Sequence, residues 1–277
     1  MSEFVPPTIL VTGATSGIGY ATARNLLDAG AMVILHGPDS GSVAQAAARL
    51  VADGADPAQI YPIAADFSRL ADVAALAREV SAKFDYLDVL VNNAGLVGPK
   101  RRIVTVDGNE LTFQVNYLAP CLLTRLLTPR LAAAQGRMVA VSSGLHRTGN
   151  INWSDPQRIR FYVPMAAYTQ SKLTLTMFAR AYAWNQDDVT ALSVHPGIVK
   201  TDLLPIYSRV GGPIDEAAAV LARLSWPDVE VVNGAYYEGL LPASPAPLVE
   251  TDSAVEQLWK LTHQLLGQHR TVAQRAA

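Results

Sequence analysis

Residues 8–19 read TILVTGATSGIG, and this stretch decides the fold. Thr8–Thr12 is a short run of apolar and β-branched residues without polar alternation, which predicts a strand buried on both faces. Three glycines follow in the pattern TGxxxGxG, and Ile18–Ala29 is predicted to be a helix. A glycine-rich turn between a strand and a helix lets the backbone approach a pyrophosphate, to which the helix N-terminus offers free N–H groups. The stretch therefore predicts a nucleotide site on the first strand of a parallel α/β sheet.

The same alternation of strands and helices continues to the end of the chain. Further strands are predicted at Met32–Leu35, Ile60–Ala64, Leu87–Val91, Arg137–Val141, Val189–Val194 and Gly234–Tyr237. Further helices are predicted at Ser42–Ala52, Leu70–Lys83, Asn109–Leu131 with an interruption near Pro120, Met165–Asn185, Asp215–Leu224 and Ser253–Leu266. Because such strand–helix–strand connections are right-handed crossovers, they predict a Rossmann-type, doubly wound parallel sheet with helices on both faces. We expect residues 1–277 to form a single domain, since no linker or repeat divides them.

Composition excludes several classes of protein. Half of the 277 residues are hydrophobic and the net charge is −2, which excludes a disordered chain and predicts no nucleic-acid partner. The N-terminus does not resemble a signal peptide, and no apolar run approaches the roughly 18 residues that span a bilayer. We therefore expect a cytoplasmic protein without membrane insertion. The single cysteine, Cys121, excludes an internal disulfide, and the five histidines lack metal-ligand spacing, so no metal site is predicted.

Several short motifs, in a fixed order, resemble those of the short-chain dehydrogenase/reductase family. They are Thr12–Gly19, Asp66 after the third strand, Asn92–Gly95 (NNAG), Asn116, the pair Ser142 and Ser143, Tyr168–Lys172 (YxxxK), and His195–Gly197 with Thr201. Each motif alone is weak, but together they cover the chain from about Thr8 to about Leu266. The stretches Asp107–Leu118, Gly234–Tyr237 and Glu256–Trp259 further resemble the retinol-dehydrogenase-like branch of the family.

The resemblance implies an oxidoreductase that moves hydride between a nicotinamide cofactor and a ketone, aldehyde or alcohol. Tyr168 would be the acid/base and Ser143 would hydrogen-bond the substrate oxygen. Lys172 would favour the Tyr168 phenolate and bind the nicotinamide ribose, while Asn116 would hold a water that links Lys172 to solvent. Independently, Tyr168 and Lys172 are four apart on a predicted helix and so share one face, and a nearby ammonium lowers the pKa of a phenol. Ser142 is expected to be a turn residue that bonds its own backbone.

The cofactor is expected along the carboxyl ends of the strands, where open α/β sheets bind ligands. Its predicted contacts are Gly13, Thr15, Ser16, Gly17, Ile18, Gly19, Gly37, Asp66, Phe67, Asn93, Ala94, Gly95, Tyr168, Lys172, Pro196, Gly197 and Thr201. Gly37 stands where NAD-preferring family members carry an acid, and Pro38 where NADP-preferring members often carry arginine. Asp39 has nearly the spacing of a ribose-binding acid, but we expect it to face solvent. Without an acid at position 37 a 2′-phosphate meets no repulsion, so NADP(H) is favoured and NAD(H) stays open.

Two variable segments, about 144–167 and 198–215, are the predicted substrate loops. The first carries His146, Ile151, Trp153, Phe161, Tyr162 and Met165. These side chains would wall a large apolar pocket, although a cover for the sheet edge or a subunit contact is an equal alternative. We expect His195 to shape its strand end and His146 to be a solvated loop histidine. The predicted partner is a small carbonyl or alcohol substrate, with a homodimer or a homotetramer left open.

Two other functions compete with the oxidoreductase. A serine hydrolase would carry a G-x-S-x-G elbow, but around Ser143 the chain reads Ala140-Val-Ser-Ser-Gly144, so the first glycine is missing. A nucleotide-binding regulator without turnover would be expected to lack Tyr168 or Lys172, and both are present. Esterase activity without nucleotide would favour the hydrolase, and NAD(P) binding without turnover would favour the regulator.

Overall fold

The computed structural model describes residues 5–199 and 211–273, with side chains described as far as residue 267. Its eight strands form one sheet in the order β3-β2-β1-β4-β5-β6-β7-β8. They are β1 (Thr8–Val11), β2 (Met32–Gly37), β3 (Ile60–Ala64), β4 (Val89–Asn92), β5 (Arg137–Val141), β6 (Thr190–His195), β7 (Tyr236–Glu238) and β8 (Leu241–Ala243). Strands β1 to β7 run parallel and β8 is antiparallel to β7. The predicted doubly wound sheet is thereby confirmed.

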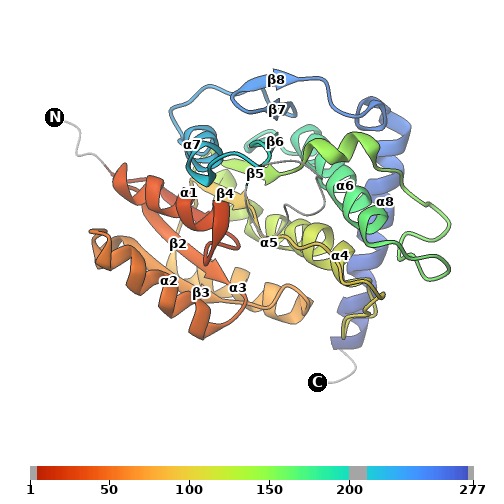
Figure 1. The fold of residues 1–277 in the computed structure, drawn as a ribbon, viewed down its shortest axis with the longest axis horizontal. Coiled ribbons are helices and arrows are strands. Elements are labelled where there is room, and N and C mark those ends of the chain that lie inside the picture. Colours follow the sequence, from red (N-terminus) through yellow and green to blue (C-terminus); the bar gives the residue numbers. More distant parts are fainter. Residues whose placement is uncertain (1–4, 200–210, 274–277) are drawn as a thin grey trace.

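Helices cover both faces of this sheet (Figure 1). They are α1 (Gly17–Asp28), α2 (Ser40–Ala52), α3 (Leu70–Lys83), α4 (Leu111–Phe113), α5 (Ala119–Ala133), α6 (Pro164–Asn185), α7 (Ile214–Leu224) and α8 (Asp252–Ala273). Shorter helical turns are η1 (Pro57–Gln59), η2 (Gln114–Leu118), η3 (Gly144–Thr148) and η5 (Pro247–Glu250). One hydrophobic cluster joins the sheet to α1, α2 and α7, and the other joins it to α3, α5, α6 and α8.

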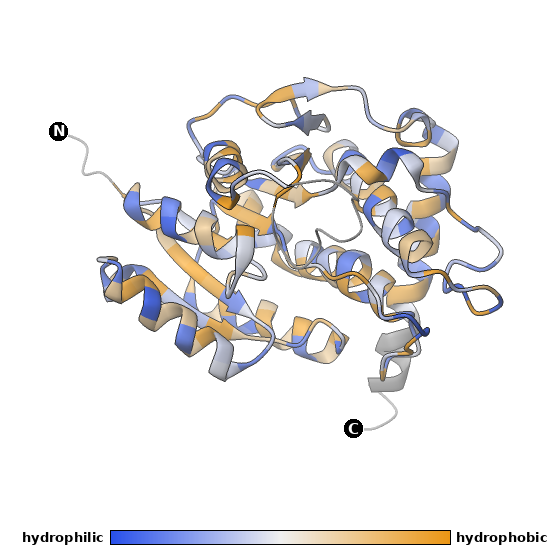
Figure 2. Cartoon of the chain, in the orientation of Figure 1, coloured by the Kyte–Doolittle hydropathy of each residue, from blue (hydrophilic) through white to orange (hydrophobic). Residues whose placement is uncertain are grey.

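The central strands show why the apolar runs lack polar alternation. Leu10 of β1 is in register with Ile34 of β2 and Leu90 of β4, and all three are fully buried in the cluster under α3 and α5. Their neighbours along each strand, such as Val11 and Leu35, are equally buried in the opposite cluster. Because both faces are covered, every strand position favours an apolar residue. Figure 2 shows the same pattern, with hydrophobic strands inside and hydrophilic residues on the outer helix faces.

Two elements differ from the prediction. The helical stretch after the NNAG motif runs from Leu111 to Ala133, and its irregularity is the π-helical turn η2, which ends just before α5. Pro120 lies at the start of α5, directly after this turn. Strand β8 was not predicted, because it is only three residues long, carries Pro242 and leaves Leu241 exposed. Within the described residues, no helix combines the length and the apolar character needed to cross a bilayer.

Candidate active site

The glycine turn between β1 and α1 is packed so tightly that glycine is required. Gly13 has φ 64° and Gly17 has φ 55°, which L-residues rarely adopt. A Cβ on Gly19 would lie 2.2 Å from the Gly13 carbonyl oxygen and 2.4 Å from Asn93 Nδ2. A Cβ on Gly13 would lie 2.8 Å from Ala94 Cα. The predicted contacts of the first and fourth strands therefore meet in one place.

Hydrogen bonds hold the ends of β1 and β4 together. Thr12 Oγ1 accepts from the backbone N–H groups of Asn93 at 2.9 Å and Ala94 at 3.0 Å. Asn93 Nδ2 donates to the carbonyl oxygens of Thr12 at 2.8 Å and Gly13 at 3.1 Å. The NNAG motif thus holds the glycine turn in place through hydrogen bonds to Thr12 and Gly13.

The N-terminus of α1 is suited to an anion. Its N-cap residue, Ser16, makes no side-chain cap bond, and the first turn carries no acidic residue. N–H groups of a first turn that lack a helical partner, together with the helix dipole, favour negative charge. Thr15 is half-buried and Ser16 exposed beside this turn, while Ile18 packs partly against the core. This is where the sequence predicts a pyrophosphate.

His36 supports the glycine turn, a role that was not predicted from the sequence. Its Nδ1 accepts from the Gly13 N–H at 3.2 Å, and its Nε2 lies 3.0 Å from the Ala65 carbonyl oxygen. One nitrogen must accept and the other donate, so the ring is neutral; burial lowers its pKa from 6.5 to about 4. The ring stacks on Phe67 at 4.5 Å. A polar residue near the end of an otherwise apolar strand was the available signal.

The two predicted cofactor residues that follow β3, Asp66 and Phe67, have different surroundings. Asp66 accepts from the Ser68 backbone N–H at 2.8 Å and from the Ser68 hydroxyl at 2.7 Å. Phe67 is buried with its ring against His36. Asp66 therefore stabilises the turn at the carboxyl end of β3. The Phe67 ring packs on His36, which in turn accepts from the Gly13 N–H of the glycine turn.

The end of β2 bears on the choice of cofactor. Gly37 is buried, and a Cβ there would lie 2.3 Å from Thr15 Cγ2 and 2.8 Å from Val43 Cγ2. Asp39 is exposed, as predicted, and caps α2 by accepting from the Ser42 N–H at 2.8 Å. Hydrogen bonds from the backbone N–H and the hydroxyl of Ser42 lower the pKa of the Asp39 carboxyl. Pro38 is exposed between them.

Arg49 brings a cation to this region that no sequence motif announced. From the last turn of α2, its Nη2 donates to the Thr15 carbonyl oxygen at 2.7 Å. Its guanidinium lies 4.5 Å from the centroid of the Tyr20 ring, a cation–π contact. The sequence could not show this contact, because Arg49 reaches the glycine turn only when α2 lies next to α1 in the fold.

Asn116 and Lys172 converge beside Gly95. A Cβ on Gly95 would lie 3.3 Å from Asn116 Oδ1 and 3.4 Å from Lys172 Nζ. Asn116 lies in the π-helical turn η2, accepting from the Leu96 N–H at 2.8 Å and donating to the Leu96 carbonyl oxygen at 2.9 Å. Its Nδ2 also donates to Ser171 Oγ at 3.0 Å. Asn116 thereby holds the segment after β4 against α6.

Tyr168 and Lys172 lie on α6 and are both buried. Lys172 Nζ donates to the Val141 carbonyl oxygen at 2.8 Å and lies 5.9 Å from the centroid of the Tyr168 ring. Burial lowers the pKa of Lys172 from 10.5 to about 8, because the charged form is desolvated. The predicted sharing of one helix face is confirmed by this contact.

Ser143 follows β5 and is buried at the N-cap of η3. Its Oγ accepts from the Leu145 N–H at 3.1 Å. Ser142 does not bond its own backbone as predicted: its hydroxyl lies 2.6 Å from Thr176 Oγ1 and 3.4 Å from the Lys172 carbonyl oxygen. These two contacts show that Ser142 faces α6.

The prediction for His146 was wrong. Its side chain is fully buried rather than solvated. Nδ1 lies 2.7 Å from the Ser143 carbonyl oxygen, and Nε2 accepts from the Ala246 N–H at 3.0 Å. Burial lowers its pKa from 6.5 to about 4, and its ring packs 4.6 Å from that of Tyr236. The ring therefore ties the serine turn to the segment after β8.

His195 is buried at the end of β6. Its ring lies 3.3 Å from the position of a Cβ on Gly144, and burial lowers its pKa. Pro196 follows, and Gly197 has φ 119°, a conformation that favours glycine. Thr201, and residues 200–210 of the second predicted substrate segment, lie outside the described residues.

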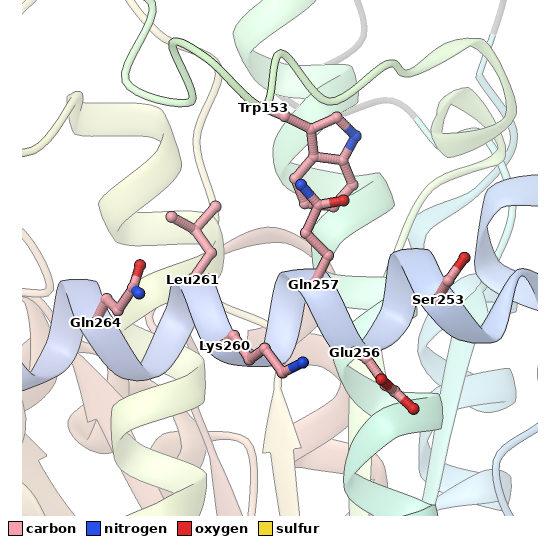
Figure 3. Close-up of a pocket in the computed structure, with 7 residues that line it drawn as sticks. All are labelled: Trp153, Ser253, Glu256, Gln257, Lys260, Leu261 and Gln264. Atoms are coloured by element: carbon pink, nitrogen blue, oxygen red, sulfur yellow. The ribbon is translucent and has the colours of Figure 1, made fainter.

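The first predicted substrate segment is partly buried and partly exposed. Ile151 is buried, but Phe161 is 74% exposed. Trp153 leans over α8, where it lines a hollow of about 520 Å³ with Gln257, Leu261 and neighbouring residues of that helix (Figure 3). This hollow contains none of the predicted catalytic residues. Among the described residues, no group of three metal-ligating side chains occurs.

Comparison with known proteins places this geometry in a family. Residues 7–208 match a family model described as short chain dehydrogenase. The chain belongs to this family. It is 34% identical to mouse retinol dehydrogenase 14, over 94% of this chain and 86% of the relative. It is also 34% identical to mouse polyprenol dehydrogenase, over 96% and 88%.

Solved structures agree with that assignment. A crystal structure of an uncharacterized protein from Mycobacterium paratuberculosis has a TM-score of 0.77 and 31% identity, covering 94% of this chain and 95% of that one. Salutaridine reductase from Papaver somniferum shares the fold at a TM-score of 0.68 and 22% identity, covering 84% and 99%. The chain is thus a short-chain dehydrogenase/reductase-type oxidoreductase of CH–OH and C=O groups that uses a nicotinamide cofactor.

Proposed function

We propose that Tyr168, Lys172, Ser143 and Asn116 form the catalytic centre of this oxidoreductase. The observation that carries the proposal is the convergence beside Gly95, where Asn116 Oδ1 and Lys172 Nζ come within 3.3 and 3.4 Å of one added Cβ position. A lysine and an asparagine buried at the carboxyl edge of the sheet need a reason to be there, because burying a charge costs free energy. Proton transfer to a bound carbonyl compound gives that reason.

When bound, the nicotinamide supplies hydride to the substrate carbon or accepts it. Tyr168 donates its phenolic proton to the carbonyl oxygen during reduction and takes it back during oxidation. The Lys172 ammonium, 5.9 Å from the ring centroid, stabilises the phenolate that forms. The Ser143 hydroxyl donates to the same substrate oxygen, where negative charge develops.

Asn116 serves this centre in two ways. Its bonds to Leu96 fix the backbone beside Gly95 of the NNAG motif. A carbonyl oxygen has two lone pairs, and the Leu96 N–H occupies one of those on Oδ1. The second is the proposed holder of a water between Lys172 and solvent.

The proposed cofactor is NADP(H). The chain supplies the parts of such a site: the open N-terminus of α1 for the pyrophosphate, and Gly95 with Lys172 for the nicotinamide ribose. No acid stands at position 37 to repel a 2′-phosphate. Arg49, held against Thr15, adds a cation on the side of the turn that faces α2. These two features support NADP(H) over NAD(H).

The proposed substrates are apolar carbonyl compounds or alcohols. The names of two relatives point to long apolar alcohols, retinol and polyprenol. Residues 144–167 and 198–215 remain the proposed substrate segments, with half-buried Leu96 and Met165 close to the catalytic residues in the chain. A cytoplasmic setting and a homodimer or homotetramer complete the proposal; the buried, unpaired Cys121 agrees with a reducing compartment.

The test is an absorbance assay of nicotinamide oxidation and reduction with both cofactors. The purified chain is offered a panel of apolar ketones, aldehydes and alcohols, including retinoids and polyprenols. Turnover with at least one compound, faster with NADP(H), is expected. Cofactor binding without turnover of any compound would instead favour a regulator, and nucleotide-independent ester hydrolysis would favour the hydrolase.

A further inference from the structure

The fully buried imidazole of His146 contacts the backbone of Ser143. Its Nδ1 lies 2.7 Å from the Ser143 carbonyl oxygen, and the His146 backbone N–H donates to the same oxygen at 3.0 Å. A carbonyl oxygen has two lone pairs, so these two contacts can occupy both of them. Together they fix the orientation of the peptide group that follows the Ser143 side chain.

The two partners of the His146 ring define where its proton lies. Nε2 accepts from the Ala246 N–H at 3.0 Å, and a backbone N–H can only donate. The proton of the neutral ring is therefore on Nδ1, and it is donated to the Ser143 carbonyl oxygen, which can only accept. Ala246 thus selects the tautomer of His146 that can hold Ser143.

The segment that carries Ala246 is anchored on the core. Ala246 and Val249 are buried in the hydrophobic cluster that includes residues of α6 and α8. Arg147, next to His146, adds a second connection to this part of the chain: its Nη2 donates to the Ser244 carbonyl oxygen at 2.8 Å and to Glu238 at 3.0 Å. His146 therefore connects the turn after β5 to the packed core.

The other end of the same turn packs against α6. A Cβ on Gly149, directly after η3, would lie 2.5 Å from the Thr169 carbonyl oxygen. Thr169 follows Tyr168 in the helix. The turn is thus held between the helix of the proposed acid/base and the segment that carries Ala246, so a shift of the turn would change how Ser143 and Tyr168 lie relative to each other.

We propose that His146 is a positioning residue for the reaction, whose Nδ1–H bond to the Ser143 carbonyl oxygen sets the direction of the Ser143 hydroxyl. This inference rests on the proposed function, because it requires Ser143 to bind the substrate oxygen. Ser143 has extended backbone, with φ −152° and ψ 146°. A change in its ψ rotates the carbonyl group relative to the side chain, and a shift of about 1 Å at a reacting group can cost about 10²-fold in rate.

The test separates the two bonds of the ring with two variants. In His146→Asn the amide nitrogen is bonded to Cγ, as Nδ1 is, so the donor to Ser143 is kept and the acceptor of the Ala246 N–H is lost. In His146→Gln the amide oxygen lies one bond further out, as Nε2 does, so the acceptor is kept and the donor is lost. Each variant is made alone and together with Ser143→Ala. Tyr182→Phe, which removes a buried hydroxyl bonded to Thr128, is the control for the loss of a buried hydrogen bond.

Turnover is measured in the nicotinamide absorbance assay and cofactor affinity by calorimetry. His146→Gln should lower kcat by at least about tenfold with KM and cofactor affinity close to those of wild type, while His146→Asn and Tyr182→Phe stay within about threefold of the wild-type kcat. In the Ser143→Ala background His146→Gln should cost less than about twofold, because both changes then act on one hydroxyl and their effects are not additive.

Three results would overturn the inference alone, given that Ser143→Ala is slow. They are a wild-type kcat for His146→Gln, an equal loss of kcat in His146→Asn and His146→Gln, and a loss from His146→Gln that is undiminished in the Ser143→Ala background. Wild-type turnover of Ser143→Ala would overturn the inference together with the proposed role of Ser143.

The tautomer is tested in the wild-type protein, independently of how well the variants fold. NMR of nitrogen-labelled histidine side chains should show one ring protonated only on Nδ1, with signals that disappear in His146→Asn. His36 should show the opposite form, because its Nδ1 accepts from the Gly13 N–H and its Nε2 lies against a carbonyl oxygen. A wild-type spectrum without a ring protonated only on Nδ1 would overturn the inference.

Discussion

Acidification is expected to destabilise the fold through two buried histidines. Burial lowers the pKa of both His36 and His146 from 6.5 to about 4. As pH falls, the unfolded chain takes up protons near 6.5 while the folded chain resists them until about 4. The stabilisation is therefore complete above pH 6.5 and is lost progressively as pH falls towards 4.

The magnitude follows from the gap between the two pKa values. About 2.5 pH units at about 1.4 kcal/mol each gives on the order of 3 kcal/mol per histidine when the pH has reached 4. For His36 the loss has a visible cause, because a proton on Nδ1 removes the acceptor of the Gly13 N–H. For His146 a proton on Nε2 removes the acceptor of the Ala246 N–H.

The assay is urea unfolding followed by circular dichroism, from about pH 7.5 to about pH 5. Carboxylates also contribute to the pH dependence of the free energy of unfolding. All three proteins share these carboxylates, so comparing wild type with His36→Asn and His146→Asn isolates the contribution of each histidine. Each variant should be less stable at neutral pH, with a pH slope shallower by up to about 1.4 kcal/mol per pH unit. His263→Asn, which changes a more exposed histidine of α8, should alter the slope least. Slopes equal to that of wild type in both variants would refute the reasoning.

Three further changes test the cofactor side of the site. Gly17→Val forces a β-branched residue to φ 55° and should abolish cofactor affinity in calorimetry, whereas Gly54→Val, at φ 107° in open space after α2, should retain it. Pro38→Arg should raise kcat/KM for NADP(H) over NAD(H) by roughly tenfold, since a guanidinium can fork onto a phosphate, and Pro38→Ala should not. Arg49→Gln should lower the same ratio; an unchanged ratio would remove Arg49 from phosphate recognition.

The sequence predicted what depends on local pattern. Buried strands, the glycine turn and the motif residues at strand ends follow from residue type and spacing, and the sheet places them at one edge. The family resemblance pointed to Asn116, but the π-helical turn that carries it was not predicted, because that turn is defined by backbone bonding in η2 rather than by composition.

What the sequence could not predict depends on contacts between distant segments. His146 looked like a solvated loop residue, yet its partner Ala246 lies 100 residues away. Arg49 reaches the glycine turn only because α2 packs beside α1. Phe161 was expected in an apolar wall, but the bonds of Asp155 to Ile159 and Arg160 hold the following loop outward.

The central claim, that Tyr168 transfers the proton, is tested most directly by Tyr168→Phe. This change keeps the ring and removes the acid, so turnover in the nicotinamide absorbance assay should fall by at least about 10²-fold, while calorimetry shows unchanged cofactor binding. Tyr182→Phe is the matched control, since it removes a hydroxyl that lies on the same helix and is hydrogen-bonded to Thr128. Its turnover should stay close to that of wild type. Turnover of Tyr168→Phe within a few-fold of wild type would contradict the account.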